Sequence, residues 1–141
     1  MANILLIDDE EEFTEVLSAR METRGFNVDV ASSGEEGIDK AKAKSYDAVI
    51  LDMAMPGMDG METLKHLLNI RPGLQIIMLT GHATVNKGVE AVKLGAADFL
   101  EKPAEINLLV EKIKQAQEKT EILFEQQLDK KLSDIMKKKG W

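Results

Sequence analysis

The 141-residue chain contains no cysteine, no excess of basic residues and no long hydrophobic run. The lack of cysteine excludes disulfides and thiolate metal sites. The formal net charge of −7 argues against a nucleic-acid-binding surface, which needs clustered Lys and Arg. Near the N-terminus only Ile4 to Ile7 are consecutively and strongly apolar, and no basic stretch precedes them. We therefore expect no signal peptide and no membrane span, and a cytoplasmic protein of one ordinary domain.

The chain alternates between short aliphatic runs and longer amphipathic stretches. The aliphatic runs predict five strands, at residues 4–7, 28–30, 49–51, 76–79 and 98–100. Three of them are continuously apolar, as in central strands of a parallel sheet that is covered on both faces. The run at 28–30 alternates between apolar and polar residues instead, which suits an edge strand.

Apolar residues at helical spacing predict a helix after each strand. Ser32–Ser33 and Asp59 precede glutamates at capping distance, and Gly25 and Gly95 supply stops. The fourth predicted helix is lined by Val85, Val89 and Val92, and the fifth begins after Pro103. Five strand–helix units in succession predict an α/β fold, an open parallel sheet with right-handed crossovers and helices on both faces.

Chemically active side chains follow the ends of the predicted strands. The first strand ends at Asp8–Asp9, the third at Asp52, the fourth at Thr80 and the fifth near Lys102. In open α/β sheets, ligands bind beyond the carboxyl ends of the strands, where the strand order reverses. We therefore expect these groups to share one rim of the sheet.

The carboxylates at this rim predict a metal site. Like charges in proximity raise one another's pKa unless a cation intervenes, and a hard ion such as Mg²⁺ prefers oxygen ligands. Beside a metal, Asp52 is a candidate phosphoryl acceptor, with Lys102 and Thr80 as charge and hydroxyl donors. A glycine-rich P-loop is missing from the sequence, so ATP is not expected as the direct donor. Residues 10–12 are interpreted as the solvated first turn of a helix.

Four segments together resemble one known family. They are "LLIDDEEE", "VILDMAMPGMDGMETL", "IIMLTGHAT" and "GAADFLEKP", and in this order and spacing they resemble the receiver domain of two-component response regulators. The resemblance covers about residues 3–119. It implies a doubly wound, flavodoxin-like (βα)5 fold with strand order 2-1-3-4-5, a receiver domain at 1–119 and a C-terminal helical extension at 120–141.

The resemblance also implies roles for single residues. Asp52 would be phosphorylated by a phosphohistidine on a sensor histidine kinase or phosphotransfer protein. Asp9 would bind Mg²⁺ directly, Asp8 mainly through water, and Ala54 through its backbone carbonyl. Lys102 would pair with the phosphoryl group. Besides its own phosphoryl chemistry, no enzymatic turnover is expected.

Further implications concern the conformational switch. Thr80 would turn its hydroxyl toward the phosphoryl group, and Phe99 would move inward with it. The Lys102–Pro103 peptide bond is typically cis in the family. His82 lies at a family position that influences access to the site, and as a loop histidine without a second ligand it is expected to be solvated.

Two other functions compete with this interpretation. A haloacid-dehalogenase-type phosphatase also uses an aspartate nucleophile, but it generally needs a second aspartate two residues later, where this chain has Ala54. A docking scaffold that works without phosphorylation is the second alternative. Because no DNA-binding or ATPase motif follows residue 103, we expect the output to be read by a protein target or a second copy, through the face of strands four and five or the C-terminal helix.

The C-terminal segment is longer than a receiver domain needs. Between Ala104 and Lys139 there is no proline or glycine, which predicts one helix of roughly 35 residues. Its first half carries apolar residues at core-facing spacing. Its second half carries an apolar stripe, formed by Leu123, Phe124, Leu128, Leu132 and Ile135. Two interpretations of this helix end are open. It is either solvated, or buried against a second copy as a short coiled coil or against a partner, and the stripe favours burial.

Overall fold

The computed structural model describes residues 2–81 and 85–140, so the expectation for His82 lies outside the described residues. Five strands and five helices alternate along this part of the chain: β1 (Asn3–Ile7), α1 (Glu11–Glu22), β2 (Asn27–Ala31), α2 (Gly34–Ala43), β3 (Ala48–Asp52), α3 (Gly60–Ile70), β4 (Ile76–Thr80), α4 (Val85–Lys93), β5 (Asp98–Glu101) and α5 (Ile106–Lys138). The five predicted strands are thus confirmed.

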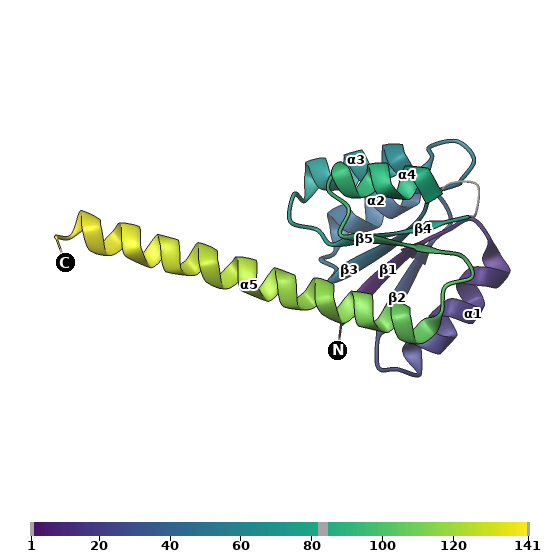
Figure 1. The fold of residues 1–141 in the computed structure, drawn as a ribbon, viewed down its shortest axis with the longest axis horizontal. Helices are drawn as coiled ribbons and strands as arrows, with labels where there is room; N and C mark the ends of the chain where they lie inside the picture. Colours follow the sequence, from purple (N-terminus) through teal and green to yellow (C-terminus); the bar gives the residue numbers. More distant parts are fainter. Residues whose placement is uncertain (1, 82–84, 141) are drawn as a thin grey trace.

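The strands form one parallel sheet in the order β2-β1-β3-β4-β5, which confirms the predicted topology. The sheet lies between two layers of helices, α1 and α5 on one face and α2, α3 and α4 on the other (Figure 1). The central strands are apolar on both faces because both are covered. In β1, Leu5 and Ile7 pack toward α2 and α3, whereas Ile4 and Leu6 pack toward α1 and α5.

Side-chain caps fix the start of three helices, and Glu105 caps α5 by accepting hydrogen bonds from the amides of Asn107 and Leu108. The other two caps are those that the sequence predicted. The Ser33 hydroxyl accepts a hydrogen bond from the Glu36 amide at 3.2 Å, at the start of α2. The Asp59 carboxylate accepts one from the Glu62 amide at 2.9 Å, at the start of α3. Both caps satisfy amide groups that lack an intrahelical partner. The structure therefore confirms the predicted capping positions.

The fourth helix packs differently from what its valines suggest. Val89 and Val92 are exposed, and among residues 86–93 of α4 the buried ones are Gly88 and Ala91. Small residues on the inner face let this helix approach β4 and β5 closely. The apolar periodicity correctly indicated a helix here, but Val89 and Val92 do not form its packed face.

Helix α5 is a single helix of 33 residues, close to the predicted length. Leu109, Ile113 and Ala116 are buried against the sheet, and every described residue from Glu118 onward is exposed. Figure 1 shows the second half projecting away from the domain without turning back. The helix is continuous through residues 119 and 120, so the division into a receiver and an extension at this point stays a prediction. No helix in the described part of the chain is both long and apolar enough to cross a membrane.

Candidate functional site

The register of the sheet places Asp8 next to Asp52. Ile7 of β1 pairs with Leu51 of β3, so the residues that follow both leave the sheet at the same edge. On the other side, β4 and β5 bring Thr80 level with Glu101, and Lys102 follows directly. The carboxyl ends of four neighbouring strands thus deliver the predicted groups to one rim, at the switch point of the strand order.

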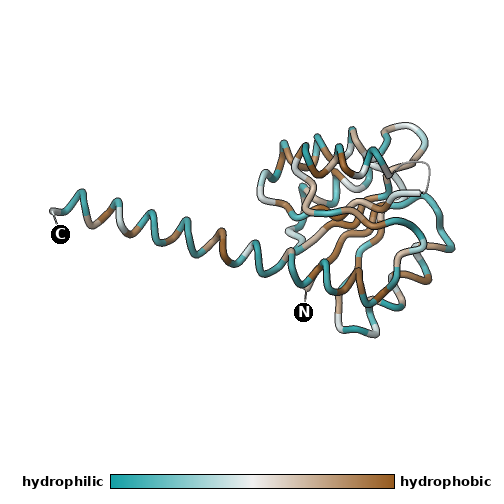
Figure 2. The backbone as a smooth tube through the Cα atoms, viewed as in Figure 1, coloured by the Kyte–Doolittle hydropathy of each residue, from teal (hydrophilic) through white to brown (hydrophobic). Residues whose placement is uncertain are grey.

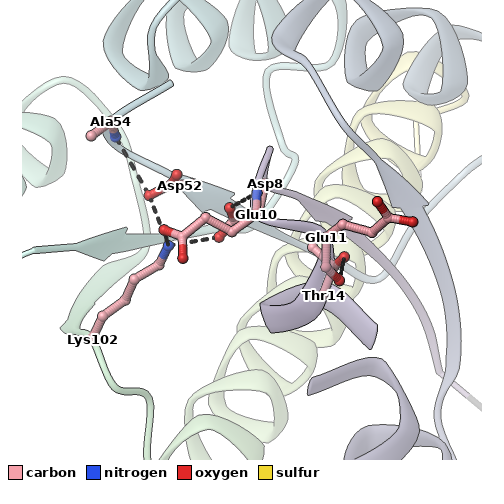
Figure 3. A network of polar contacts seen from close by, with 7 residues as sticks. All are labelled: Asp8, Glu10, Glu11, Thr14, Asp52, Ala54 and Lys102. Atoms are coloured by element: carbon pink, nitrogen blue, oxygen red, sulfur yellow. Dashed lines mark hydrogen bonds and ion pairs between the residues drawn. The ribbon is translucent and has the colours of Figure 1, made fainter. Parts of the chain in front are cut away.

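The Lys102 side chain reaches into this rim and contacts three carboxylates (Figure 3). Its ammonium lies 2.8 Å from Asp8 Oδ2, 3.1 Å from Glu10 Oε1 and 3.4 Å from Asp52 Oδ1. The side chains of Asp8 and Asp52 are almost fully buried, and that of Lys102 is 17% exposed. The Glu10 side chain is 64% exposed. One cation therefore faces two buried anions and one solvated anion, and the rim carries an excess of negative charge.

Glu10 takes part in the site, which the sequence did not predict. It is the N-cap residue of α1, and its amide donates a hydrogen bond to Asp8 Oδ1 at 2.9 Å. This turn brings its carboxylate back toward Lys102. Oxygen atoms of Asp8, Glu10 and Asp52 lie within 4.8 Å of one another, in an arrangement that could hold a metal ion. Asp9, by contrast, is exposed and is not a member of this cluster.

The two oxygens of Asp52 have different surroundings. Oδ1 accepts a hydrogen bond from the Ala54 amide at 3.4 Å and faces Lys102. Oδ2 is buried and has no hydrogen-bond partner among the described residues. A buried anionic oxygen without a donor has an uncompensated desolvation cost.

Glycine at position 60 is required by the close packing behind Asp52. A Cβ atom there would lie 2.5 Å from the Asp52 carbonyl oxygen and 2.6 Å from the Met53 Cα. The first turn of α3 therefore packs directly against the backbone of Asp52 and Met53. The Gly60 amide donates to the Met53 carbonyl at 3.0 Å, which fixes this contact.

Burial and charge change the acidity of two groups in the site. Burial, with the negative charge of Asp8 added, raises the pKa of Asp52 to about 6, although Lys102 opposes the shift. Burial alone would lower the pKa of Lys102, but the hydrogen bond to Asp8 and the charges of Asp52 and Asp8 together raise it. Lys102 therefore stays protonated at neutral pH, and Asp52 is an anion that gains from any further positive charge.

Thr80 and Phe99 meet at α4, away from the carboxylates. Thr80 is fully buried, and its hydroxyl donates to the Leu100 carbonyl at 3.4 Å. Both side chains lie against Gly88, because a Cβ atom there would be 2.7 Å from the Phe99 ring and 3.1 Å from Thr80 Cγ2. The half-buried ring thus touches the same helix residue as the threonine methyl group. The structure brings these two predicted switch residues together, but it does not direct the Thr80 hydroxyl at Asp52.

A groove runs from the site along α1. It has a volume of about 420 Å³ and is lined by Glu10, Phe13, Val16, Leu17, Arg20, Lys102, Pro103 and Ala104. The groove therefore adjoins the site at Glu10 and Lys102.

The Lys102 ammonium lies 4.4 Å from the centre of the Phe13 ring, a cation–π contact that the sequence did not predict. The Lys102–Pro103 bond is cis, as the resemblance implied.

Comparison with known proteins identifies the family. The family model of the response regulator receiver domain matches residues 4–114. The chain belongs to this family. The receiver resemblance is thereby confirmed, and the chain contains a response regulator receiver domain.

Relatives and solved structures agree with this assignment. The transcriptional regulatory protein ZraR of Salmonella typhimurium is 35% identical over 81% of this chain and 26% of its own length. The C4-dicarboxylate transport transcriptional regulatory protein DctD of Rhizobium meliloti is 33% identical over 87% of this chain and 27% of its own length. A response regulator receiver domain protein from Clostridium thermocellum superimposes with a TM-score of 0.83 at 35% identity, covering 87% of this chain and 99% of that one.

The chain spans about a quarter of the length of ZraR and DctD. Both are named transcriptional regulators, and most of their length lies outside the matched region. The expectation that no nucleic acid is bound therefore concerns this chain alone, whose net charge is −7.

Proposed function

We propose that Asp52 of this receiver accepts a phosphoryl group from a phosphohistidine on a sensor histidine kinase or phosphotransfer protein. The observation that carries the proposal is the buried, unpartnered Oδ2 of Asp52 beside a protonated lysine. Its partner oxygen is already engaged by Lys102 and the Ala54 amide. One oxygen of the carboxylate is thus held in place while the other is available for bond formation.

The reaction needs positioning and positive charge more than acid–base chemistry. Oδ2 of Asp52 attacks phosphorus, the P–N bond to the donor imidazole breaks, and the imidazole leaves with the bonding electron pair. Lys102 neutralises part of the charge that develops on the phosphoryl oxygens. Its contacts with Asp8 and Glu10 hold the ammonium within reach of that group.

The oxygen donors of the rim fit a magnesium ion. Asp8 and Asp52 supply buried carboxylates, and oxygen atoms of Asp8, Glu10 and Asp52 lie within 4.8 Å of one another. We propose that Asp8, Asp9, Asp52 and the Ala54 carbonyl hold the ion, as the family resemblance implies, and that Glu10 instead neutralises Lys102. When bound, the ion supplies the positive charge that three carboxylates and a phosphoryl group require.

The phosphoryl group would change the shape of the β4–β5 face through Thr80 and Phe99. The Thr80 hydroxyl can interact with phosphoryl oxygens only in the modified protein, so it distinguishes the two states. Its methyl group and the Phe99 ring share the contact with Gly88, which would transmit the movement. We propose that a downstream protein or a second copy reads this face.

The direct test is labelling by a small phosphodonor. The full chain is incubated with Mg²⁺ and acetyl phosphate, and the intact mass is measured. We expect one added phosphoryl group in the parent and in Asp39→Asn, which alters an exposed carboxylate of α2, but none in Asp52→Asn. Full labelling of Asp52→Asn would refute the assignment, and no labelling of the parent would favour the docking scaffold.

A second measurement tests the switch. Amide NMR spectra of the phosphorylated parent and of Thr80→Ala are compared with those of the unmodified proteins. Thr80→Ala should accept the phosphoryl group but show a smaller shift change around Phe99. An equal response in both proteins would show that Thr80 does not couple the site to β5.

A further inference from the structure

The second half of α5 has no contact with the receiver. The last buried residue is Ala116, and the described residues from Glu118 to Gly140 are all exposed. Figure 2 shows that hydrophobic residues nevertheless recur along this part between hydrophilic ones. Helices in proteins gain most of their stability from packing of an apolar face, so these side chains are candidates for contact with another surface.

Four of these side chains form one stripe. Phe124 is 66% exposed, and the other three, Leu128, Leu132 and Ile135, are 42–50% exposed. At 100° per residue the four lie within about 80° of one another around the axis. Phe124 and Ile135 are about three helical turns apart, so the stripe runs almost straight along the helix. A second helix could therefore lie alongside it without strong supercoiling.

The charges of this segment are separated along its length. Its first part, residues 118–129, carries Glu118, Glu121, Glu125 and Asp129 against a single lysine. Its second part, residues 130–139, carries Lys130, Lys131, Lys137, Lys138 and Lys139 against a single aspartate. The helix macrodipole favours lysines in the last turn, but its influence does not extend to carboxylates in the middle of a helix. The acidic half therefore needs another explanation.

We propose that residues 121–139 pair with the same segment of a second copy in antiparallel orientation. When two identical helices with an acidic and a basic half pair in antiparallel orientation, each acidic half lies beside a basic half. Parallel pairing would place like charges beside each other in both halves. A two-fold axis near Lys130 places Leu128 opposite Leu132 of the second copy. The overlap ends near residue 121, beyond the buried Ala116, so the receivers lie at opposite ends and do not obstruct it.

The contact between two such short segments is small, which predicts weak association. Sedimentation equilibrium of the unmodified full chain should show a mass that rises from monomer to dimer between roughly 10 µM and 1 mM. Leu128→Asn with Leu132→Asn should weaken the dimer at least about tenfold, whereas Ile122→Asn, an exposed apolar residue outside the stripe, should change it little. A monomer at every concentration, or equal effects of both changes, would overturn the proposal.

Charge reversal tests the orientation. Glu121→Lys with Glu125→Lys should weaken the dimer roughly tenfold, as should Lys137→Glu with Lys138→Glu, and the four changes in one chain should restore it. Raising the salt from about 50 to 500 mM should also weaken it. A parallel dimer would give the opposite salt effect, and neither double variant would weaken it.

A distance measurement provides an independent check. The chain has no cysteine, so a spin label can be attached at Thr120→Cys alone. Antiparallel pairing about residue 130 places two labels about 30 Å apart along the axis, whereas parallel pairing leaves them about 10 Å apart. The short distance would overturn the proposal. Because these experiments use the unphosphorylated chain, their outcome does not depend on the function proposed for Asp52.

Discussion

Lys102 lies closer to Asp8 than to the proposed phosphoryl acceptor Asp52. The ammonium is 2.8 Å from Asp8 Oδ2 and 3.4 Å from Asp52 Oδ1. Asp8 therefore has two opposite effects on Asp52. Its charge raises the pKa of that carboxyl directly, and its ion pair holds the lysine that lowers it.

Asp8→Asn should lower the pKa of Asp52 from about 6 toward the ordinary value of 3.8. The substitution removes the negative charge that, after burial, contributes most to the shift, and this direct effect is larger than the opposite effect of a less firmly held Lys102. The measurement is a carboxyl carbon NMR titration without Mg²⁺. Glu12→Gln, an exposed carboxylate of α1, is the control. An unchanged pKa in Asp8→Asn would contradict the electrostatic account of the site.

Asp52→Asn should stabilise the unphosphorylated fold at pH 7.5. Because the pKa of Asp52 is higher in the folded state than the ordinary value, the folded protein binds more protons between about pH 4 and 6, and it loses stability as the pH rises through that window. The charged carboxylate then costs on the order of 1–3 kcal/mol at neutral pH. Thermal unfolding should show a higher Tm for the variant at pH 7.5 and no gain near pH 4. A variant that is less stable than the parent at pH 7.5 would refute this.

The fold could be predicted from the sequence because its signals are local. Continuous apolar runs marked β1, β3 and β4, and the caps at Ser33 and Asp59 form as their spacing indicated. The packing of α4 could not be predicted this way. Among residues 86–93 of this helix the buried residues are Gly88 and Ala91, and small residues give only a weak hydrophobic signal in a sequence pattern.

The site was predictable only in part. The strand ends located Asp8, Asp52, Thr80 and Lys102, because the carboxyl edge of a parallel sheet gathers whatever follows its strands. The inward turn of Glu10 depends on the hydrogen bond from its own amide to Asp8, which a run of acidic residues does not reveal. The position of Asp9 outside the cluster has the same cause, since the chain turns into α1 directly after it.

Mg²⁺ should raise the Tm of the parent protein, and the gain should disappear with EDTA. Binding to the folded state alone stabilises it by about 1.4 kcal/mol at ten times the dissociation constant. If Asp9 is a ligand, Asp9→Asn should weaken the affinity for Mg²⁺ at least about tenfold, and Glu10→Gln should weaken it much less, because Lys102 already neutralises that carboxylate. The reverse order in a titration followed by Tm would assign the third carboxylate to Glu10.

Gly88→Ala should expose the coupling between α4 and the switch residues. The new methyl group would lie 2.7 Å from the Phe99 ring, so the ring or the helix must move. Overpacking costs about 1–3 kcal/mol, and the higher helix propensity of alanine offsets up to about 1 kcal/mol of it. Urea unfolding should therefore show a net loss of about 1 kcal/mol in Gly88→Ala.

Phe99→Ala removes the ring that Gly88→Ala would displace, so the two changes should not add. In the double variant the alanine at position 88 has space. Its effect on the free energy of unfolding should therefore change from a loss to a small gain, which comes from the higher helix propensity of alanine. Thr80→Ser removes only a methyl group, which would lie 3.1 Å from a Cβ atom at position 88. Added to Gly88→Ala, it should relieve part of the overpacking. A double-mutant cycle should give a coupling of about 1 kcal/mol between positions 88 and 99. Strict additivity would show that the Phe99 ring already has room to move, and that Gly88 does not hold it in the unphosphorylated position.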